Sequence, residues 1–187
     1  MPAHQEIEIK FQIDNLSQLQ AKLRVAGFRR TTPRTHEMNT LYDWSGQVLR
    51  KRDELLRLRK YGKVWLLTHK SKGTTGRHKS RAETETEIAD GEPMAAILES
   101  LGLRPSFVYE KFRAEWTDGK GHVVIDETPI GNFGEIEGST KWIDAAAQAL
   151  AIHPRQYITQ SYTQLFFEWK SKTRSLAREM TFSACKD

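Results

Sequence analysis

Residues 6–11 of the chain read Glu-Ile-Glu-Ile-Lys-Phe, and this stretch decides which fold the sequence predicts. Charged and apolar residues alternate with a period of two, which is typical of a β-strand with one charged and one apolar face. Glu6, Glu8 and Lys10 share the charged face. Neighbouring carboxylates repel each other unless a cation lies between them. The stretch is therefore either the solvated side of a sheet or part of a cation site.

The composition excludes several classes of protein. The chain has 187 residues, of which 38% are hydrophobic and 28% charged, as in a soluble globular protein of one domain or two small halves. A single cysteine, Cys185, excludes a disulfide framework or a CxxC zinc site within one chain. The sequence has no apolar run of membrane length and no signal-peptide pattern at its start. We therefore expect a cytoplasmic protein with no membrane partner.

The charge balance predicts an anionic partner. The formal net charge is +5 at neutral pH, which suits a phosphate-rich small molecule, nucleic acid or a membrane surface. Glutamates are mixed among the basic residues, whereas nucleic acid selects an uninterrupted positive surface. We therefore expect that no nucleic acid is required.

The alternation of residues 6–11 recurs along the chain, between amphipathic segments. Strands are expected over residues 35–43, 55–61, 64–70, 81–88, 108–116, 122–127 and 132–138. Helices are expected over residues 15–26, 93–101, 140–151 and 161–176. Pro33 is expected to interrupt the chain before the second strand, and the residues around Cys185 are expected to be frayed. Residues 49–54 fit a turn or a short helix equally well.

Residues 71–80 form a basic segment rich in glycine, threonine and lysine. The segment lacks the Gly-Lys-Ser/Thr ending of a phosphate-binding P-loop, and it follows no parallel-sheet pattern. A mobile basic lid and a solvated linker both remain open interpretations.

The charged strand faces meet if the antiparallel strands close into a barrel. With these faces inward, cations would lie beside carboxylates, and burying such charges is costly. The cost is understandable if the cavity is wet and holds a polyanion with a divalent metal. The alternative is an exposed sheet with solvated charges. The residues concerned are Glu6, Glu8, Lys10, Arg57, Arg59, Lys70, Arg81, Glu83, Lys111, Arg113, Asp126, Glu135 and Glu137.

In their order along the chain, these motifs resemble the CYTH family, which comprises class IV adenylyl cyclases, thiamine triphosphatases and other triphosphate tunnel metalloenzymes. The resemblance extends from Glu6 to about Tyr162. It implies an α+β fold, built on an eight-stranded antiparallel closed β-barrel with flanking helices. Residues 1–170 would form this tunnel domain, and residues 171–187 the end of the last helix and a tail. The matching motifs are Glu6-x-Glu8-x-Lys10, Arg57-x-Arg59, Thr68-His69-Lys70, Arg81-x-Glu83, Glu110-Lys111-x-Arg113, Asp126 and Glu135-x-Glu137.

The resemblance also implies roles for these residues. Bound Mg²⁺ or Mn²⁺ would be held by Glu6, Glu8, Asp126, Glu135 and Glu137. Substrate phosphates would be held by Lys10, Arg57, Arg59, Lys70, Arg81, Lys111 and Arg113, with Glu83 on the same wall. Catalytic roles fall to Glu6, Glu8, Lys10 and Lys70. Three further glutamates lie on the same charged faces of their strands: Glu85, Glu87 and Glu115. They receive no role, because the end of a strand can extend beyond the tunnel.

The sequence favours a metal-dependent enzyme that hydrolyses a phosphoanhydride bond. Its partner would be a triphosphate-containing small molecule: a nucleoside triphosphate, thiamine triphosphate or tripolyphosphate. A class IV adenylyl cyclase is the first alternative, because residues 126–131 and 161–162 resemble those of bacterial proteins with that label. This resemblance also suggests a homodimer. A non-catalytic polyphosphate-binding module is the second. Hydrolysis is preferred because the sequence displays no nucleoside pocket.

Overall fold

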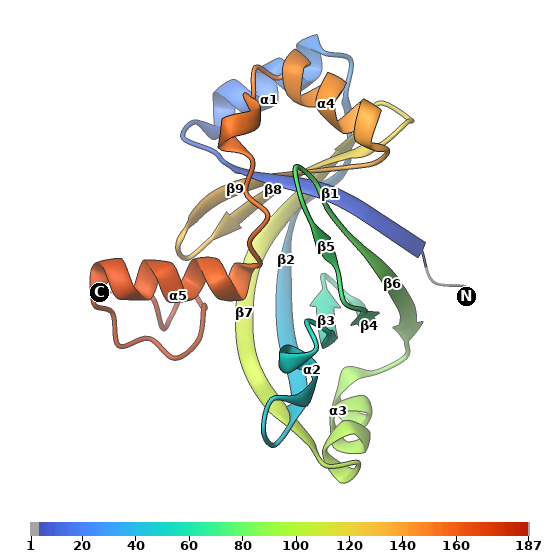
Figure 1. Ribbon diagram of the computed structural model, residues 1–187, viewed down its shortest axis with the longest axis vertical. Helices are drawn as coiled ribbons and strands as arrows, with labels where there is room; N and C mark the ends of the chain where they lie inside the picture. Colours follow the sequence, from blue (N-terminus) through green and yellow to red (C-terminus); the bar gives the residue numbers. More distant parts are fainter. Residues whose placement is uncertain (1–3, 187) are drawn as a thin grey trace.

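The computed structural model describes residues 4–186, and its centre is a closed β-barrel (Figure 1). Eight antiparallel strands follow one another around the barrel in the order β1-β9-β8-β7-β2-β3-β4-β6. The ring closes because β6 also pairs with β1, where Glu6 lies opposite Arg81. The predicted α+β fold with an eight-stranded antiparallel barrel is confirmed.

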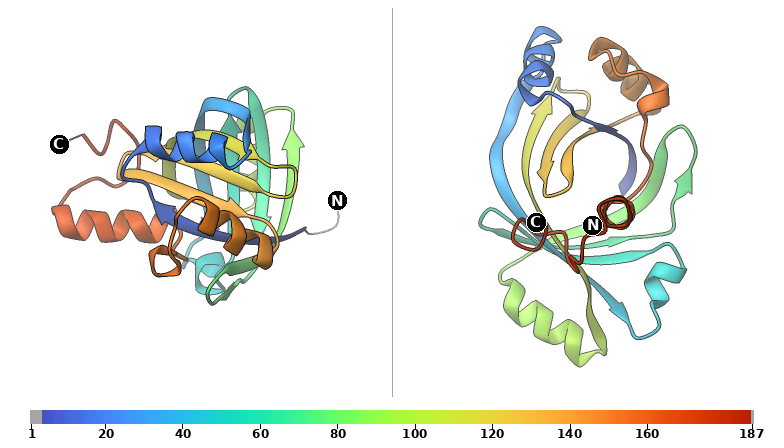
Figure 2. Two further views of the ribbon diagram at one scale, coloured as in Figure 1. Left: turned by 90° about the horizontal axis from the view of Figure 1, so that it is seen from above. Right: turned by 90° about the vertical axis from the view of Figure 1, so that its left-hand side faces the viewer.

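Most strand bounds lie close to those predicted. The ring consists of β1 (His4–Gln12), β2 (Arg29–Trp44), β3 (Leu55–Tyr61), β4 (Val64–Lys70), β6 (Lys79–Ile88), β7 (Leu103–Thr117), β8 (His122–Thr128) and β9 (Gly131–Glu137). A two-residue strand, β5 (Thr74–Thr75), pairs with the start of β6. The long strands β2 and β7 pair along most of their length and form a long, curved part of the barrel (Figure 2).

The helices cover the outside of the barrel. The structure has α1 (Leu16–Val25), α2 (Val48–Lys51), α3 (Gly91–Ser100), α4 (Thr140–Ala149), the short 3₁₀ helix η1 (Pro154–Gln156) and α5 (Tyr162–Thr173). Helices α1 and α4 lie together at one end of the molecule and α3 at the other (Figure 1). Residues 49–54, which the sequence left undecided, begin within the short helix α2 and continue into a turn. Among the described helices, none is long and apolar enough to cross a membrane.

The main apolar core lies between the barrel wall and helices α1 and α4. Ile9 of β1 and Ile136 of β9 point outward and are completely buried, together with Leu23 of α1 and Ile143 of α4. Because side chains alternate along a strand, the neighbours of Ile9 and Ile136 point into the barrel. The prediction that apolar faces lie outside under helices and charged faces inside is confirmed.

Two expectations near the ends of elements are wrong. Strand β2 runs through Pro33, because the β2–β7 register shifts between Thr32 and Thr35 and leaves Pro33 without a partner in that ladder, where its missing N–H is not required. The last helix ends at Thr173, and Leu176 lies beyond it with 90% of its surface exposed. The pattern of apolar residues therefore continued past the helix end.

The residues before Cys185 are ordered against the barrel rather than frayed. Met180 is fully buried and forms a parallel bridge with Tyr109 of β7. Its N–H donates to the carbonyl of Val108 at 3.0 Å, and its carbonyl accepts from the N–H of Glu110 at 3.0 Å. Backbone pairing of this kind has no periodic sequence signal, which is why the sequence did not predict it.

Gly134 of β9 packs directly against the ring of Phe11 of β1, and a β-carbon at Gly134 would overlap with the ring. We predict that Gly134→Ala lowers the free energy of unfolding by about 1–3 kcal/mol, because the ring must leave its position. Gly76→Ala is the control, since its β-carbon would lie 3.9 Å from the nearest atom. Urea unfolding of both variants tests this, and equal stabilities would contradict it.

Candidate functional site

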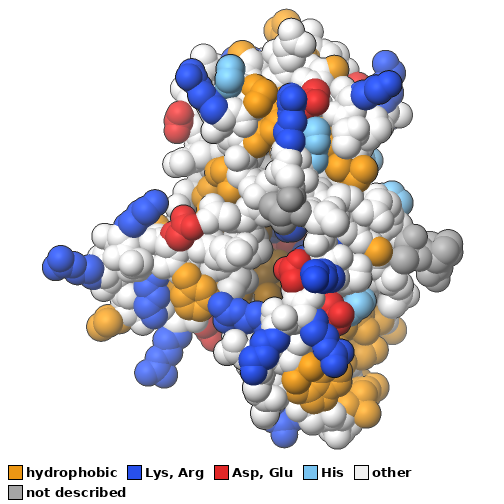
Figure 3. Space-filling model, viewed as in Figure 1, with side chains coloured by type: hydrophobic (Ala, Val, Ile, Leu, Met, Phe, Trp, Pro, Cys, Tyr) orange, Lys and Arg blue, Asp and Glu red, His pale blue; other side chains and the backbone are white. Residues whose placement is uncertain are grey.

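The inside of the barrel encloses a cavity of about 480 Å³ with an unusually charged wall. In the space-filling view, acidic and basic side chains gather around a hollow in the middle of the molecule (Figure 3). All predicted site residues except Asp126 line the cavity. Seven glutamates and eight lysines or arginines line it: Glu6, Glu8, Glu83, Glu85, Glu115, Glu135, Glu137, Lys10, Arg57, Arg59, Lys70, Lys79, Arg81, Lys111 and Arg113.

The strand register brings these side chains together. Across β1 and β9, Lys10 lies opposite Glu135 and Glu8 lies opposite Glu137. Directly paired residues point to the same face of a sheet, so these four side chains all enter the cavity. The alternation of residues 6–11 therefore fixes one wall of the site.

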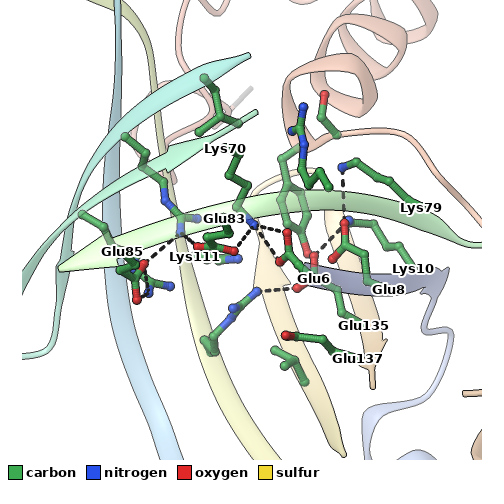
Figure 4. Close-up of a pocket in the computed structure, with 18 of the residues that line it drawn as sticks. Glu6, Glu8, Lys10, Lys70, Lys79, Glu83, Glu85, Lys111, Glu135 and Glu137 are labelled. Carbon is green, nitrogen blue, oxygen red and sulfur yellow. Dashed lines mark hydrogen bonds and ion pairs between the residues drawn. The ribbon is translucent and has the colours of Figure 1, made fainter. Parts of the chain in front are cut away.

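Each of three carboxylates on this wall is paired with a lysine (Figure 4). The ammonium of Lys70 lies 2.6 Å from both carboxylate oxygens of Glu6, and that of Lys10 lies 2.9 Å from Glu135. Glu8 receives the ammonium of Lys79 at 3.2 Å. Burial alone would lower the pKa values of Lys10 and Lys70, but the surrounding carboxylates raise both above the ordinary value.

Glu137 differs from the other three. Among residues 4–186, no lysine, arginine or histidine forms an ion pair with it, and no dashed line reaches its carboxylate in Figure 4. Burial, together with the negative charges of Glu6, Glu8 and Glu135, raises the pKa of Glu137 to about 7. The wall thus holds one more carboxylate than its lysines neutralise.

This donor set fits a divalent metal. Carboxylate oxygens are the ligands that Mg²⁺ and Mn²⁺ prefer, and a cation would relieve the repulsion that raises the pKa of Glu137. Within the described chain, no three acidic or histidine side chains already form a coordination group. The lysine pairing of Glu6, Glu8 and Glu135 accounts for this. The side chains that would hold a metal here are Glu6, Glu8, Glu135 and Glu137.

Asp126, the remaining predicted metal ligand, points into the barrel, because it lies opposite Arg113, but it does not line the cavity. Its carboxylate is fully buried and accepts from Lys111 at 2.9 Å and from Arg113 at 2.8 and 2.6 Å. The hydroxyl of Tyr162, at the start of α5, donates to it at 2.6 Å. In this arrangement Asp126 orients two cations toward the cavity.

A second buried carboxylate, Glu37 of β2, was not identified from the sequence. It lies 3.6 Å from Lys111 and 3.7 Å from both Arg59 and Arg113. Burial opposes its ionisation, but these cations lower the pKa of Glu37 well below its ordinary value. The amide of Asn39 donates to it at 2.9 Å. The alternation of Glu37 and Asn39 within residues 35–43 was the signal that could have revealed both.

The opposite wall consists mainly of arginines. Arg59 contacts both oxygens of Glu85 at 3.0 and 2.9 Å, and Arg57 donates to Thr68 at 3.3 Å. Arg81 instead donates to the carbonyl oxygens of Ser71 and Asp53, so it is fixed near the rim. Guanidinium groups that contact carboxylates in pairs of hydrogen bonds can contact phosphate oxygens in the same way.

Comparison with protein families gives one match that covers most of the chain, to the CYTH domain over residues 4–172. A relative from Methanocaldococcus jannaschii, provisionally named an adenylate cyclase, is 27% identical over 171 residues. That alignment covers 86% of this chain and 97% of the relative.

Solved structures share the fold. A protein of Vibrio parahaemolyticus, provisionally named an adenylate cyclase, superimposes with a TM-score of 0.77 at 19% identity, over 87% of this chain and 97% of that one. A Hippeastrum protein superimposes with a TM-score of 0.62 at 20% identity, over 87% of this chain and 95% of that one. The latter is provisionally named an adenylyl cyclase and described as having a dominant triphosphatase activity.

The raised pKa of Glu137 predicts how the metal-free protein responds to pH. Since this pKa of about 7 exceeds the ordinary value of 4.5, the folded state binds more protons than the unfolded state between these values. Glu137 therefore lowers the free energy of unfolding as pH rises through that range. We expect Glu137→Gln to remove this contribution, so that the variant gains stability relative to the wild type between pH 4.5 and 7.

Urea unfolding at pH 4.5, 6 and 7.5 in the presence of a chelator measures this difference. Glu92→Gln, a change on the exposed surface of α3, is the control and should parallel the wild type. A stability difference between Glu137→Gln and the wild type that does not change with pH would contradict the assignment.

Proposed function

The chain belongs to the CYTH domain family, and we propose that it is a metal-dependent enzyme that hydrolyses triphosphate-containing substrates. The substrates would be nucleoside triphosphates, thiamine triphosphate or tripolyphosphate, and the bond cleaved is a phosphoanhydride bond. The metal would be Mg²⁺ or Mn²⁺.

One observation carries the proposal: buried lysines and arginines surround the cavity, and Lys10, Lys70 and Arg113 each lie within 3 Å of a carboxylate. Carboxylates raise the pKa values of Lys10, Lys70 and Arg113, although burial opposes this. A triphosphate brings many negatively charged oxygens and can replace these carboxylates as the partner of each cation. The wall of Glu6, Glu8, Glu135 and Glu137 would then be available for the metal.

The residues of the chain would bind and orient the phosphates. Arg57 and Arg59 hold phosphate oxygens from the β3 wall, while Lys111 and Arg113 hold them from β7, oriented by Asp126 and Glu37. A bound divalent metal neutralises charge on the phosphate oxygens. In the hydrolysis, the oxygen of water bonds to the terminal phosphorus, the bridging P–O bond breaks, and orthophosphate and a diphosphate product leave.

Adenylyl cyclase activity is the second candidate. The Methanocaldococcus jannaschii relative and both structural neighbours described above carry provisional adenylate or adenylyl cyclase names. A second cavity of about 400 Å³ adjoins the first and shares Leu41, Leu55 and Thr163 with it, and its further lining includes Phe107 and Phe167. Apolar and aromatic groups suit a nucleoside. Hydrolysis is placed first because it requires only water as the nucleophile, and because the Hippeastrum protein is described as chiefly a triphosphatase.

Phosphorus NMR of the products distinguishes these activities. The protein is incubated with ATP or with tripolyphosphate, each in the presence of Mg²⁺ or Mn²⁺. We expect orthophosphate, and most of all from tripolyphosphate. Cyclic AMP with pyrophosphate would instead establish the cyclase and overturn the proposal.

We predict that Glu6→Gln lowers kcat with tripolyphosphate and Mn²⁺ at least about 100-fold, because a charged metal ligand is lost. Glu92→Gln, on the exposed surface of α3, is the control and should keep wild-type activity. A polyphosphate-binding module behaves differently, since removal of a negative charge preserves or strengthens anion binding. Calorimetry of tripolyphosphate binding to Glu6→Gln separates the two, and unchanged turnover in this variant would contradict the proposed role of Glu6.

A further inference from the structure

The basic hairpin, residues 71–80, is fastened at its tip to helix α4. A guanidinium nitrogen of Arg77 and the Nε2 atom of His78 each lie 3.0 Å from Oδ1 of Asp144. The hydroxyl of Tyr157 donates to the same oxygen at 3.4 Å. Arg77 also lies over the ring of Tyr157, 5.9 Å from its centre. One carboxylate of α4 therefore joins two consecutive hairpin residues to the barrel exterior.

The residue after this contact reaches the candidate site. Lys79 lines the cavity, and its ammonium lies 3.2 Å from Glu8 of the carboxylate wall. Its neighbour Ser80 accepts from Gln5 of β1 at 2.6 Å. Lys79 is the first residue of β6 and lies opposite Glu8 in the β1–β6 pairing, so the hairpin tip connects directly to the end of the ladder that carries the Lys79 ammonium.

The base of the hairpin has its own anchor, which does not involve Asp144. The N–H of Gly73 donates to Asp53 at 3.2 Å, and the Nε atom of Arg81 donates to the carbonyl of Ser71 at 3.0 Å. Loss of the contact with α4 would therefore release the tip while the base stays in place. This separation makes the role of Asp144 testable without unfolding the barrel.

We propose that Asp144 is a positioning residue of the active site: through Arg77 and His78 it holds the basic hairpin, and with it Lys79, against the phosphate-binding cavity. The inference rests on the proposed function, since Lys79 contacts substrate only if the cavity binds a triphosphate. The sequence left two interpretations of the hairpin open, a mobile lid and a solvated linker. The proposal assigns it the role of a lid that the contact with Asp144 holds in place.

The test compares Asp144→Asn with the wild type in two measurements. Amide hydrogen exchange of the metal-free protein should be about fivefold to tenfold faster at Gly76 and the β5–β6 pairs, and unchanged in β8. KM for tripolyphosphate with Mn²⁺ should rise by a similar factor while kcat stays within about twofold, because a lid contact binds the ground state and the transition state alike.

Gln148→Ala is the matched control. Gln148 lies one turn after Asp144 on α4, and both line a surface groove that Arg77 also borders. In the described residues Gln148 has no hydrogen bond to the hairpin. This variant should match the wild type in both measurements. His78→Gln should show part of the effect of Asp144→Asn, because Arg77 still contacts Asp144 in this variant. The double variant should match Asp144→Asn, because the His78–Asp144 contact is already lost there.

Unchanged exchange of the hairpin in Asp144→Asn would overturn the proposal, as would faster exchange without any rise in KM. Additive effects of Asp144→Asn and His78→Gln would also contradict it. If the wild type turns over no triphosphate, the proposed function fails. In that case exchange and the tripolyphosphate affinity of the metal-free variants still decide whether Asp144 holds Lys79 in place.

Discussion

The pairing of buried charges inside the barrel is the constraint on which the rest of the structure depends. An unpaired lysine or glutamate in such an interior would be very costly, so each cation needs a carboxylate within reach. Lys10 meets Glu135, Lys70 meets Glu6, and Arg59 meets Glu85. The Lys70–Glu6 pair joins β4 to β1 across the β6–β1 pairing that closes the ring, so this pair depends on closure. Closure also turns the apolar faces outward, which is why α1 and α4 must cover them.

The same pairing prepares the cavity for an anion. Replacing a buried ion pair by apolar groups is often neutral or stabilising, so stability alone does not explain such an interior. Phosphate oxygens can replace the carboxylates that now contact the cations of the cavity. Asp126 and Glu37 do not line the cavity, so they stay bound to Lys111 and Arg113 and keep them oriented. Glu137 has no lysine partner in the described chain and so provides the excess negative charge that a metal would neutralise.

Much of this was predictable from residue alternation. Residues 6–11 alone left a solvated face open, but recurrence of their pattern in later strands favoured inward charged faces, and the same parity located Arg57, Arg59, Lys111 and Arg113. What the sequence missed depends on contacts without a periodic signal. Pro33 was expected to interrupt the chain, because a register shift is not visible in the sequence. The residues around Cys185 were expected to be frayed, because the backbone pairing of Met180 leaves no sequence signal. Asp126 was placed in the correct strand, but its burial away from the cavity was not predicted. Its hydrogen bonds to Lys111, Arg113 and Tyr162 hold it there.

On the proposed function, a metal and a triphosphate replace the internal ion pairs of the barrel. Crystals grown with Mn²⁺ and a non-hydrolysable tripolyphosphate analogue, with anomalous diffraction data that locate the manganese, test this most directly. We predict manganese between the carboxylates of Glu6, Glu8, Glu135 and Glu137, with phosphates against Arg57, Arg59 and Lys111. Manganese outside the barrel, or an analogue bound elsewhere while the Lys10–Glu135 and Lys70–Glu6 pairs persist, would contradict the account.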